Sequence, residues 1–217
     1  MAKLESSFKN MVISLTGISL FAALALGSVY TLTKEPIEAS KTAKLQNAIN
    51  EVVPGFKRLD EPEKVAISAG DSINVYRAYD ANEKFMGAAV ESLSHKGFSG
   101  DIRIMVGFDV NGNIINYSVL EQKETPGLGT KMVEWFKTDK GNQSVKGKNP
   151  AKNKLTVSKD GGEVDAITAA TISSRAFLNA ISNAYEAYSK NANATDGESG
   201  ATVKNEVASD NDKTVSN

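Results

Sequence analysis

The feature that most restricts how this chain folds is an uncharged stretch of 23 residues, Met11 to Thr33. As a helix rising about 1.5 Å per residue it is roughly 35 Å long, and the hydrocarbon core of a bilayer is about 30 Å thick. A cleaved signal peptide is the alternative, with Ala23-Leu24-Ala25 as the cleavage site, but the uncharged stretch continues well beyond that point. We therefore predict a retained transmembrane helix over residues 11–33.

The charges that flank this segment predict its orientation. Lys3 and Lys9 precede it with only Glu5 against them, whereas Lys34-Glu35 after it cancel. Because positive charges stay on the cytoplasmic side of a membrane, the N-terminus, residues 1–10, is expected in the cytoplasm. The prediction is a single-pass protein of the cell inner (cytoplasmic) membrane, with its domain on the extracytoplasmic, periplasmic side.

The C-terminal segment has a different composition. Residues 190–217 contain no Leu, Ile, Met or aromatic side chain. Such a segment cannot bury enough apolar surface to offset the entropy of ordering it, so we predict a disordered tail. The folded domain is then expected over residues 34–189.

Charge and composition exclude several kinds of function. Lys and Arg number 25 against 26 Asp and Glu, a net charge of -1 that offers no basic surface for nucleic acid. The chain has no cysteine and one histidine, His95, which we expect on the surface. Disulfides, thiolate chemistry and cysteine-held metal or iron–sulfur centres are thereby excluded, and no metal site is predicted. Redox chemistry in this chain would need an organic cofactor.

The predicted fold class is α+β, an antiparallel sheet with flanking helices behind one N-terminal transmembrane helix. A helix after Pro36 is expected to end at Pro54-Gly55, and Asn111-Gly112 is a strong hairpin signal. The expected strands are Ile73 to Tyr79, Phe85 to Leu93, Ile102 to Val110, Ile114 to Leu120 and Lys154 to Ser158; the expected helices are Lys131 to Phe136 and Ser173 to Tyr188. No phosphate-binding glycine loop of a nucleotide-binding fold is present.

The segment Glu124-Thr125-Pro126-Gly127-Leu128-Gly129 lies between an expected strand and an expected helix. A proline flanked by flexible glycines makes a rigid turn, in which backbone N–H groups and one apolar side chain can approach a flat ligand. A plain strand-to-helix turn explains the same residues.

A second segment of small and hydroxyl residues comes at the start of the last expected helix. Its sequence is Asp165-Ala-Ile-Thr-Ala-Ala-Thr171-Ile-Ser-Ser174. Free N–H groups and the helix dipole favour an anion such as a phosphate at this place. Simple N-capping by Thr171 or Ser173 is the alternative.

Taken together, the two segments resemble a known family, the FMN-binding domain family of the covalent-flavin subunits of the Rnf and Nqr membrane redox complexes. The resemblance also includes Gly97-Phe98-Ser99-Gly100 and the hairpin sequence from Asp109 to Ile114. In that family FMN is attached through its phosphate, as a phosphoester, to the threonine that ends an S/T-G-A-T motif. The match to that motif runs position by position through Thr168, Ala169, Ala170 and Thr171.

The resemblance therefore implies that Thr171 carries the flavin. Asp165 matches the family's acidic position, in a motif that a separate flavin transferase is thought to need for maturation. Glu124, Thr125, Leu128 and Gly129 are the expected neighbours of the flavin ring. Trp135 is expected in the core of the short helix, and stacking on the ring is the alternative. Ala169 departs from the family, where glycine is commonest, and its methyl group is tolerated unless the backbone there needs a positive φ.

A second motif, Ser199-Gly200-Ala201-Thr202, matches the family pattern with the usual glycine. It lies in the expected tail, with no helix after it and no apolar residues to shield a flavin ring. Thr171 precedes a strongly amphipathic helix, so composition favours Thr171.

The resemblance implies an electron relay that works with other membrane subunits of a redox complex that moves sodium ions or protons. The short chain with one compact domain favours the Rnf type, ferredoxin to NAD, over the Nqr type, NADH to quinone. Two alternatives remain open. One is a membrane-anchored binding or scaffold domain that uses Thr171 only as a helix cap. The other is a solitary flavoprotein that feeds another extracytoplasmic reductase.

Overall fold

The computed structural model describes residues 8–198, with side chains to residue 192. The first residues of the expected cytoplasmic segment, most of the expected tail and the second motif at Thr202 lie outside the described residues.

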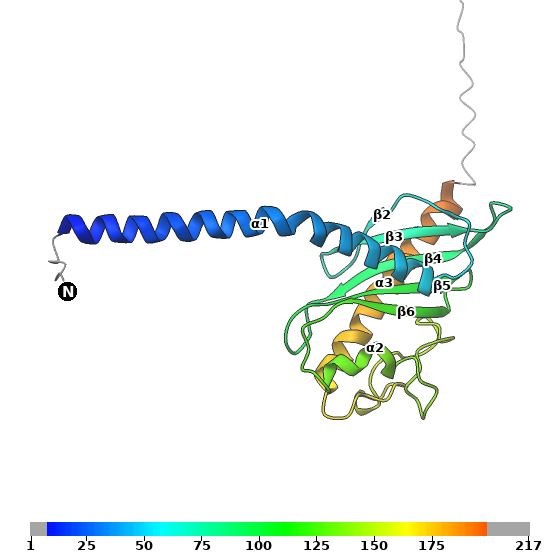
Figure 1. Cartoon of the computed structure of the whole chain (residues 1–217). Coiled ribbons are helices and arrows are strands. Elements are labelled where there is room, and N and C mark those ends of the chain that lie inside the picture. Colours follow the sequence, from blue (N-terminus) through cyan, green and yellow to red (C-terminus); the bar gives the residue numbers. More distant parts are fainter. Residues whose placement is uncertain (1–7, 199–217) are drawn as a thin grey trace, which may run out of the picture.

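The described chain begins with one helix, α1 (Phe8–Val52), of 45 residues. It contains an 18-residue window with a mean hydropathy of 2.0, none of it buried, and is long and apolar enough to cross a membrane. The helix expected after Pro36 is the continuation of this same helix. Proline lacks an N–H and crowds the carbonyl four residues earlier, which bends a helix. Figure 1 shows α1 changing direction before it reaches the sheet.

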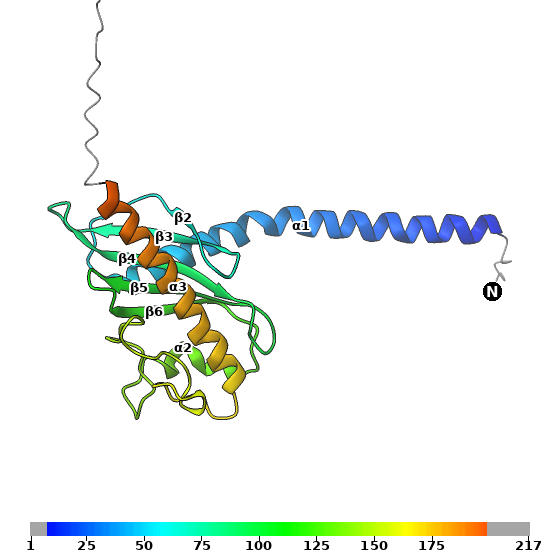
Figure 2. The ribbon, with the colours of Figure 1, turned by 180° about the vertical axis from the view of Figure 1, so that it is seen from behind.

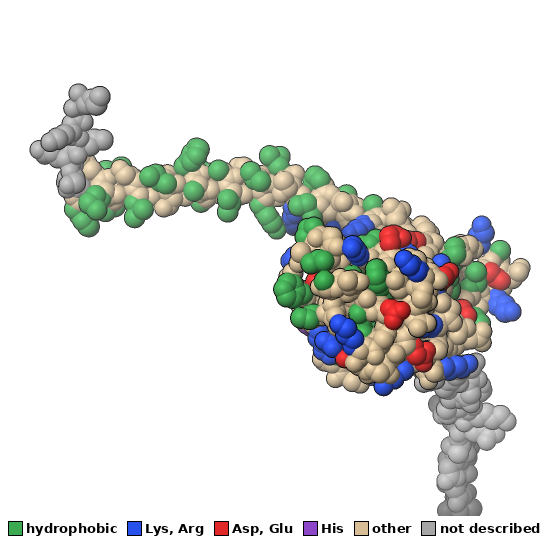
Figure 3. All heavy atoms as spheres, turned by 90° about the horizontal axis from the view of Figure 1, so that it is seen from below, with side chains coloured by type: hydrophobic (Ala, Val, Ile, Leu, Met, Phe, Trp, Pro, Cys, Tyr) green, Lys and Arg blue, Asp and Glu red, His purple; other side chains and the backbone are tan. Residues whose placement is uncertain are grey.

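The surface of α1 differs from that of the domain. Figure 3 shows hydrophobic side chains all along the outer part of α1, whereas Lys, Arg, Asp and Glu are interspersed over the domain. Phe21, Leu24 and Leu26 are between 62% and 77% exposed. Exposing such a large apolar surface to water is unfavourable. The surface of this helix is suited to the hydrocarbon core of a bilayer.

The domain is built on a six-stranded antiparallel sheet in the order β1-β3-β4-β5-β6, with β2 also paired to β3. The strands are β1 (Arg58–Leu59), β2 (Glu63–Ala66), β3 (Ser72–Tyr79), β4 (Phe85–Ser94), β5 (Ile102–Asp109) and β6 (Ile114–Glu121). The prediction of an α+β fold with an antiparallel sheet is therefore confirmed, and β3 to β6 match the four expected strands within two residues. At the β5–β6 turn, Gly112 has a φ of +77°, as the hairpin signal requires.

Two features differ from the sequence-based prediction. The short strands β1 and β2 were not expected, because two and four residues carry too little alternation to be recognised. The strand predicted over Lys154 to Ser158 is wrong: this segment makes an isolated bridge between Val157 and Val164 and then a 3-10 turn, η2 (Ser158–Asp160). Gly161, with a φ of +73°, turns the chain back on itself before a ladder can form.

A helix covers each face of the sheet (Figures 1 and 2). The last turns of α1 bury Ala48, Ile49 and Val52 against one face. On the other face lies α3 (Thr171–Glu198), which buries Phe177, Leu178, Ile181 and other residues in the larger core. Between β6 and α3 come the 3-10 turn η1 (Gly129–Lys131), the short helix α2 (Met132–Trp135) and a long loop.

The last helix extends further than expected. It begins two residues before Ser173 and continues past Tyr188 to Glu198, so the segment where we expect the tail starts inside α3. Asn191 is buried and donates a hydrogen bond to the Glu63 carboxylate, and the Lys190 ammonium group donates to the Ala66 carbonyl oxygen at 3.1 Å. These contacts attach the helix end to β2 and give residues just beyond 189 a place in the domain.

Candidate functional site

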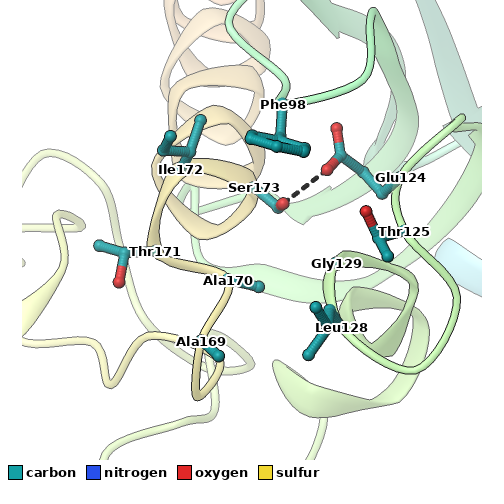
Figure 4. A pocket seen from close by; sticks show the side chains of 10 residues that line it. All are labelled: Phe98, Glu124, Thr125, Leu128, Gly129, Ala169, Ala170, Thr171, Ile172 and Ser173. Atoms are coloured by element: carbon teal, nitrogen blue, oxygen red, sulfur yellow. Dashed lines mark hydrogen bonds between the residues drawn. The ribbon is translucent and has the colours of Figure 1, made fainter.

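A pocket of about 340 Å³ forms where three loop or terminal segments meet. The segments are the β4–β5 loop, the turn of residues 124–129 and the start of α3, and Figure 4 shows their side chains arranged around a common space. The lining residues are Phe98, Glu124, Thr125, Leu128, Gly129, Ala169, Ala170, Thr171, Ile172 and Ser173. The two segments that sequence analysis singled out thus form one site.

The turn of residues 124–129 is closed by its own hydrogen bonds. The Leu128 N–H donates to the Thr125 carbonyl at 3.1 Å, and the Gly127 N–H donates to the Thr130 hydroxyl at 3.0 Å. Gly127 has a φ of +77°, which glycine adopts without strain. The closed turn leaves Leu128 37% exposed, and this side chain lines the pocket.

The start of α3 is also a tight structure. The Ser174 hydroxyl donates to the Ala170 carbonyl at 2.9 Å and accepts from the Ile167 N–H at the same distance. Ser173 does not act as the N-cap, because its hydroxyl donates to the Glu124 carboxylate instead. Thr171 is the first residue of α3 and is half-buried, and its hydroxyl makes no hydrogen bond with the described residues.

Ala169 adopts the backbone conformation that would disfavour a side chain. Its φ is +63°, in the left-handed region. The backbone at residue 169 therefore does have the positive φ at which alanine is less favourable than glycine. A Cβ in this region costs roughly 1–2 kcal/mol. Sequence comparison with the family raised the question at this position, but only the backbone geometry answers it.

Most of the predicted site residues come together. Seven line the pocket, and Thr168 is exposed beside it without lining it. Figure 4 shows Thr171 at the side of the pocket, its side chain directed away from Glu124 and Thr125. Sequence analysis did not assign Phe98, Ile172 or Ser173 to the site, although Phe98 lies in a segment that matches the family. Phe98 and Ile172 are 65% and 48% exposed and form an apolar rim.

Asp165 supports the segment before α3 from outside the pocket. Its carboxylate accepts from the Ser158 hydroxyl at 2.7 Å and from the Asn142 N–H at 3.0 Å, and these bonds lower the pKa of Asp165. The Trp135 indole N–H donates to the Asp165 carbonyl oxygen at 2.9 Å. Trp135 packs against the core, as expected, and does not line the pocket.

His95 is exposed, as predicted, and lies between two carboxylates. Its Nδ1 is 2.8 Å from Asp101 and its Nε2 is 3.5 Å from Asp71. The hydrogen bond to Asp101 is the main cause that raises the pKa of His95, and Asp71 adds to it. These contacts link the β4–β5 loop, which carries Phe98, to the turn before β3.

The structure combines a helix that is long and apolar enough to cross a membrane with an α+β domain that has a ligand-sized pocket. Comparison with known proteins gives the class of this domain, a cofactor-binding domain. Residues 97–186 match the FMN-binding domain family, a range that contains the whole pocket. Proteins named as the G subunit of an ion-translocating oxidoreductase complex are similar over most of their length. The one from Aliivibrio fischeri (strain MJ11) is 34% identical over 184 residues, 77% of this chain and 85% of the relative. The Shewanella amazonensis protein is 31% identical over 82% of this chain and 86% of its own length.

The chain therefore belongs to the Rnf-type family of G subunits of ion-translocating oxidoreductase complexes. This confirms the resemblance drawn from the turn of residues 124–129 and the hydroxyl-rich start of α3.

Proposed function

We propose that this chain is the electron-carrying subunit of a membrane-bound, Rnf-type ion-translocating oxidoreductase complex, and that it holds FMN as a phosphoester on Thr171. The observation that carries the proposal is the Thr171 hydroxyl. This hydroxyl has no hydrogen-bond partner among the described residues, and Thr171 is the first residue of a 28-residue helix beside the pocket.

The residues of the pocket suit both ends of FMN. The first turn of α3 offers unpaired N–H groups and the positive end of a helix dipole, which favour a phosphate. Phe98, Leu128 and Ile172 supply an apolar surface for a flat ring, and the cavity size falls in the range of ligand pockets. Bound FMN supplies reversible electron uptake, which the side chains of this protein lack.

A covalent attachment is a useful property for a carrier at an extracytoplasmic site. The ester would prevent loss of the cofactor and keep the ring at high effective concentration near its redox partners. The position of Thr171 at the side of the pocket supports access for a flavin transferase, because its side chain is not enclosed by Glu124 and Thr125.

The relatives' names support the assembly that we propose. They are subunits of ion-translocating complexes, and we infer that this chain passes electrons between partner subunits on the route from ferredoxin to NAD. Residues 11–33 of α1 carry no charge and offer no ion path, so ion movement would belong to the other subunits. By the distribution of flanking charges, the domain would face the periplasmic side.

The test is the intact mass and visible absorbance of the full chain, purified in detergent after co-expression with a flavin transferase. The wild type is expected to be yellow and heavier by FMN less one water. Thr171→Ala should lose both signals. Thr138→Ala is the matched control, since it removes an exposed hydroxyl that lies outside both the pocket and the motif, and it should retain them.

Other results would point elsewhere. A Thr171→Ala protein that stays yellow and heavy would contradict the assignment, and Thr202→Ala would then be the variant to measure. A colourless wild type, despite an active transferase, would favour a scaffold domain without a cofactor.

A further inference from the structure

The three segments that form the pocket are far apart in the sequence, and one buried side chain connects them. Glu124 is 4% exposed. Its Oε2 accepts from the Ser173 hydroxyl at 2.6 Å, and its Oε1 accepts from the Ser99 N–H at 3.1 Å. Ser99 belongs to the β4–β5 loop and Ser173 to the first turn of α3, so the carboxylate of the 124–129 turn bridges the other two walls. Figure 4 shows the bond to Ser173.

The space around this carboxylate is filled. A Cβ built on Gly129 would lie 2.6 Å from the Ser173 hydroxyl oxygen and 2.7 Å from the Glu124 Cβ. A Cβ on Gly97 would lie 2.8 Å from the Glu124 Oε1 and 2.0 Å from the Gly100 carbonyl oxygen. Real side chains do not approach so closely, so glycine at both positions lets the two loops close around the carboxylate.

The charge of Glu124 has no cation beside it. None of the ion pairs within residues 8–192 includes Glu124. Burying a carboxylate without a counter-charge is unfavourable, and here two hydrogen bonds to the charged group offset it. A bridge of this kind is costly to break, because removing the acceptor leaves the buried Ser173 hydroxyl without a partner and also removes the part-buried bond from the Ser99 N–H.

We propose that Glu124 is a positioning residue, whose carboxylate holds the β4–β5 loop and the first turn of α3 against the 124–129 turn and so assembles the pocket. The inference rests on the proposed function for the identity of the ligand. The contacts themselves are made by the chain alone, and they differ from the flavin contact expected for Glu124 from the sequence. A pocket assembled in advance binds its ligand without the entropy cost of ordering two loops.

The first measurement is amide hydrogen exchange in the full chain carrying Thr171→Ala, which removes the proposed attachment site. Glu124→Ala should raise exchange at residues 97–100 about tenfold or more, the opening that loss of a hydrogen bond to a charged group permits. Glu124→Gln keeps an acceptor for the Ser99 N–H and can donate to the Ser173 oxygen, so exchange should stay within about twofold of the parent. Glu121→Ala, an exposed glutamate at the end of β6, is the matched control.

The second measurement is FMN attachment in the chain with Thr171 intact. Glu124→Ala should reduce the modified fraction about tenfold, and Glu124→Gln should rescue it to near the wild-type level. Ser173→Ala removes one of the two bridges, and it replaces Glu124→Ala as the test if that variant does not fold. It is expected to raise exchange in the first turn of α3.

Two results would overturn the proposal. One is unchanged exchange in the folded Glu124→Ala or Ser173→Ala protein. The other is a Glu124→Gln protein as impaired as Glu124→Ala, because the pocket would then need the charge rather than the bridge. If the wild type carries no FMN, the proposed function fails, whereas the exchange experiment still decides the role of Glu124.

Discussion

The helices α1 and α3 lie on opposite faces of one sheet, but they pack against it in different ways. On the α3 face the core is large and aromatic: Phe177 stacks on Phe136 with ring centroids 4.4 Å apart and meets Tyr117 edge-on at 4.7 Å. On the α1 face the core is smaller and mostly aliphatic. Gly107 lies so close to α1 that a Cβ there would be 2.1 Å from the Val52 carbonyl oxygen.

The difference places the packing of α1 on one face of the sheet and the pocket on the other. The α3 face holds the pocket, because Phe136 follows α2, which follows the 124–129 turn, and stacking on Phe177 places that turn beside the start of α3. On the α1 face, Gly107 lets the end of the long apolar helix lie close against the sheet backbone. A substitution on the α3 face should therefore affect the pocket more than a substitution on the α1 face.

The largest effect is expected from Phe177→Ala. Removing a fully buried aromatic ring leaves a cavity beside Phe136 and should lower the free energy of unfolding by about 3–5 kcal/mol. FMN attachment should also fall, because the contact between α2 and α3 loosens. Denaturation of the full chain in detergent, followed by Trp135 fluorescence, measures the first effect, and a loss below about 1 kcal/mol would contradict this account of the α3 face.

A smaller effect is expected on the other face from Gly107→Ala. The added methyl group meets backbone atoms of Val52 that have no rotamer to change, so α1 or the strand must shift, at about 1–3 kcal/mol. FMN attachment should remain near the wild-type level, as judged by absorbance. Loss of attachment as severe as in Phe177→Ala would show that the two faces are not separable.

The smallest effect is expected within the site, from Ala169→Gly. Glycine adopts the observed positive φ without strain, and after its greater freedom in the unfolded chain is allowed for, the gain should be up to about 1 kcal/mol. Ala170→Gly is the control, because Ala170 does not have a positive φ and should lose stability. Equal changes in the two variants would mean that the backbone at Ala169 is not strained.

The membrane helix, four of the strands and the last helix could be predicted from the sequence because each rests on a local pattern. An uncharged run, alternating apolar residues, the Asn111-Gly112 turn and the apolar face of α3 all act within a few residues. Other features depend on partners elsewhere in the chain. These are the pairing of the short strands β1 and β2, the lack of a strand at Lys154 and the extension of α3. Local propensity carries no information about those partners.

The site divides in the same way. Family motifs in the sequence identified two of the three segments that line the pocket. Composition favours Thr171 over Thr202, and that choice stays a prediction. Motifs did not indicate Phe98 and Ile172 at the rim, nor that the Ser173 hydroxyl bonds to Glu124 rather than capping its helix. Each of these depends on a contact between segments more than twenty residues apart.

The amino-acid sequence alone is enough to predict a helix long and apolar enough to cross a membrane, an α+β domain without cysteine, and two motifs that resemble those of a flavin-binding family. Those properties follow from residue type and local spacing, which act on the chain before it folds. Three further properties are visible only in the folded protein: the motifs share one pocket, Ala169 has a positive φ, and a buried carboxylate connects the three walls. The reason is physical: burial, hydrogen-bond partners and backbone strain exist only once distant segments have packed together.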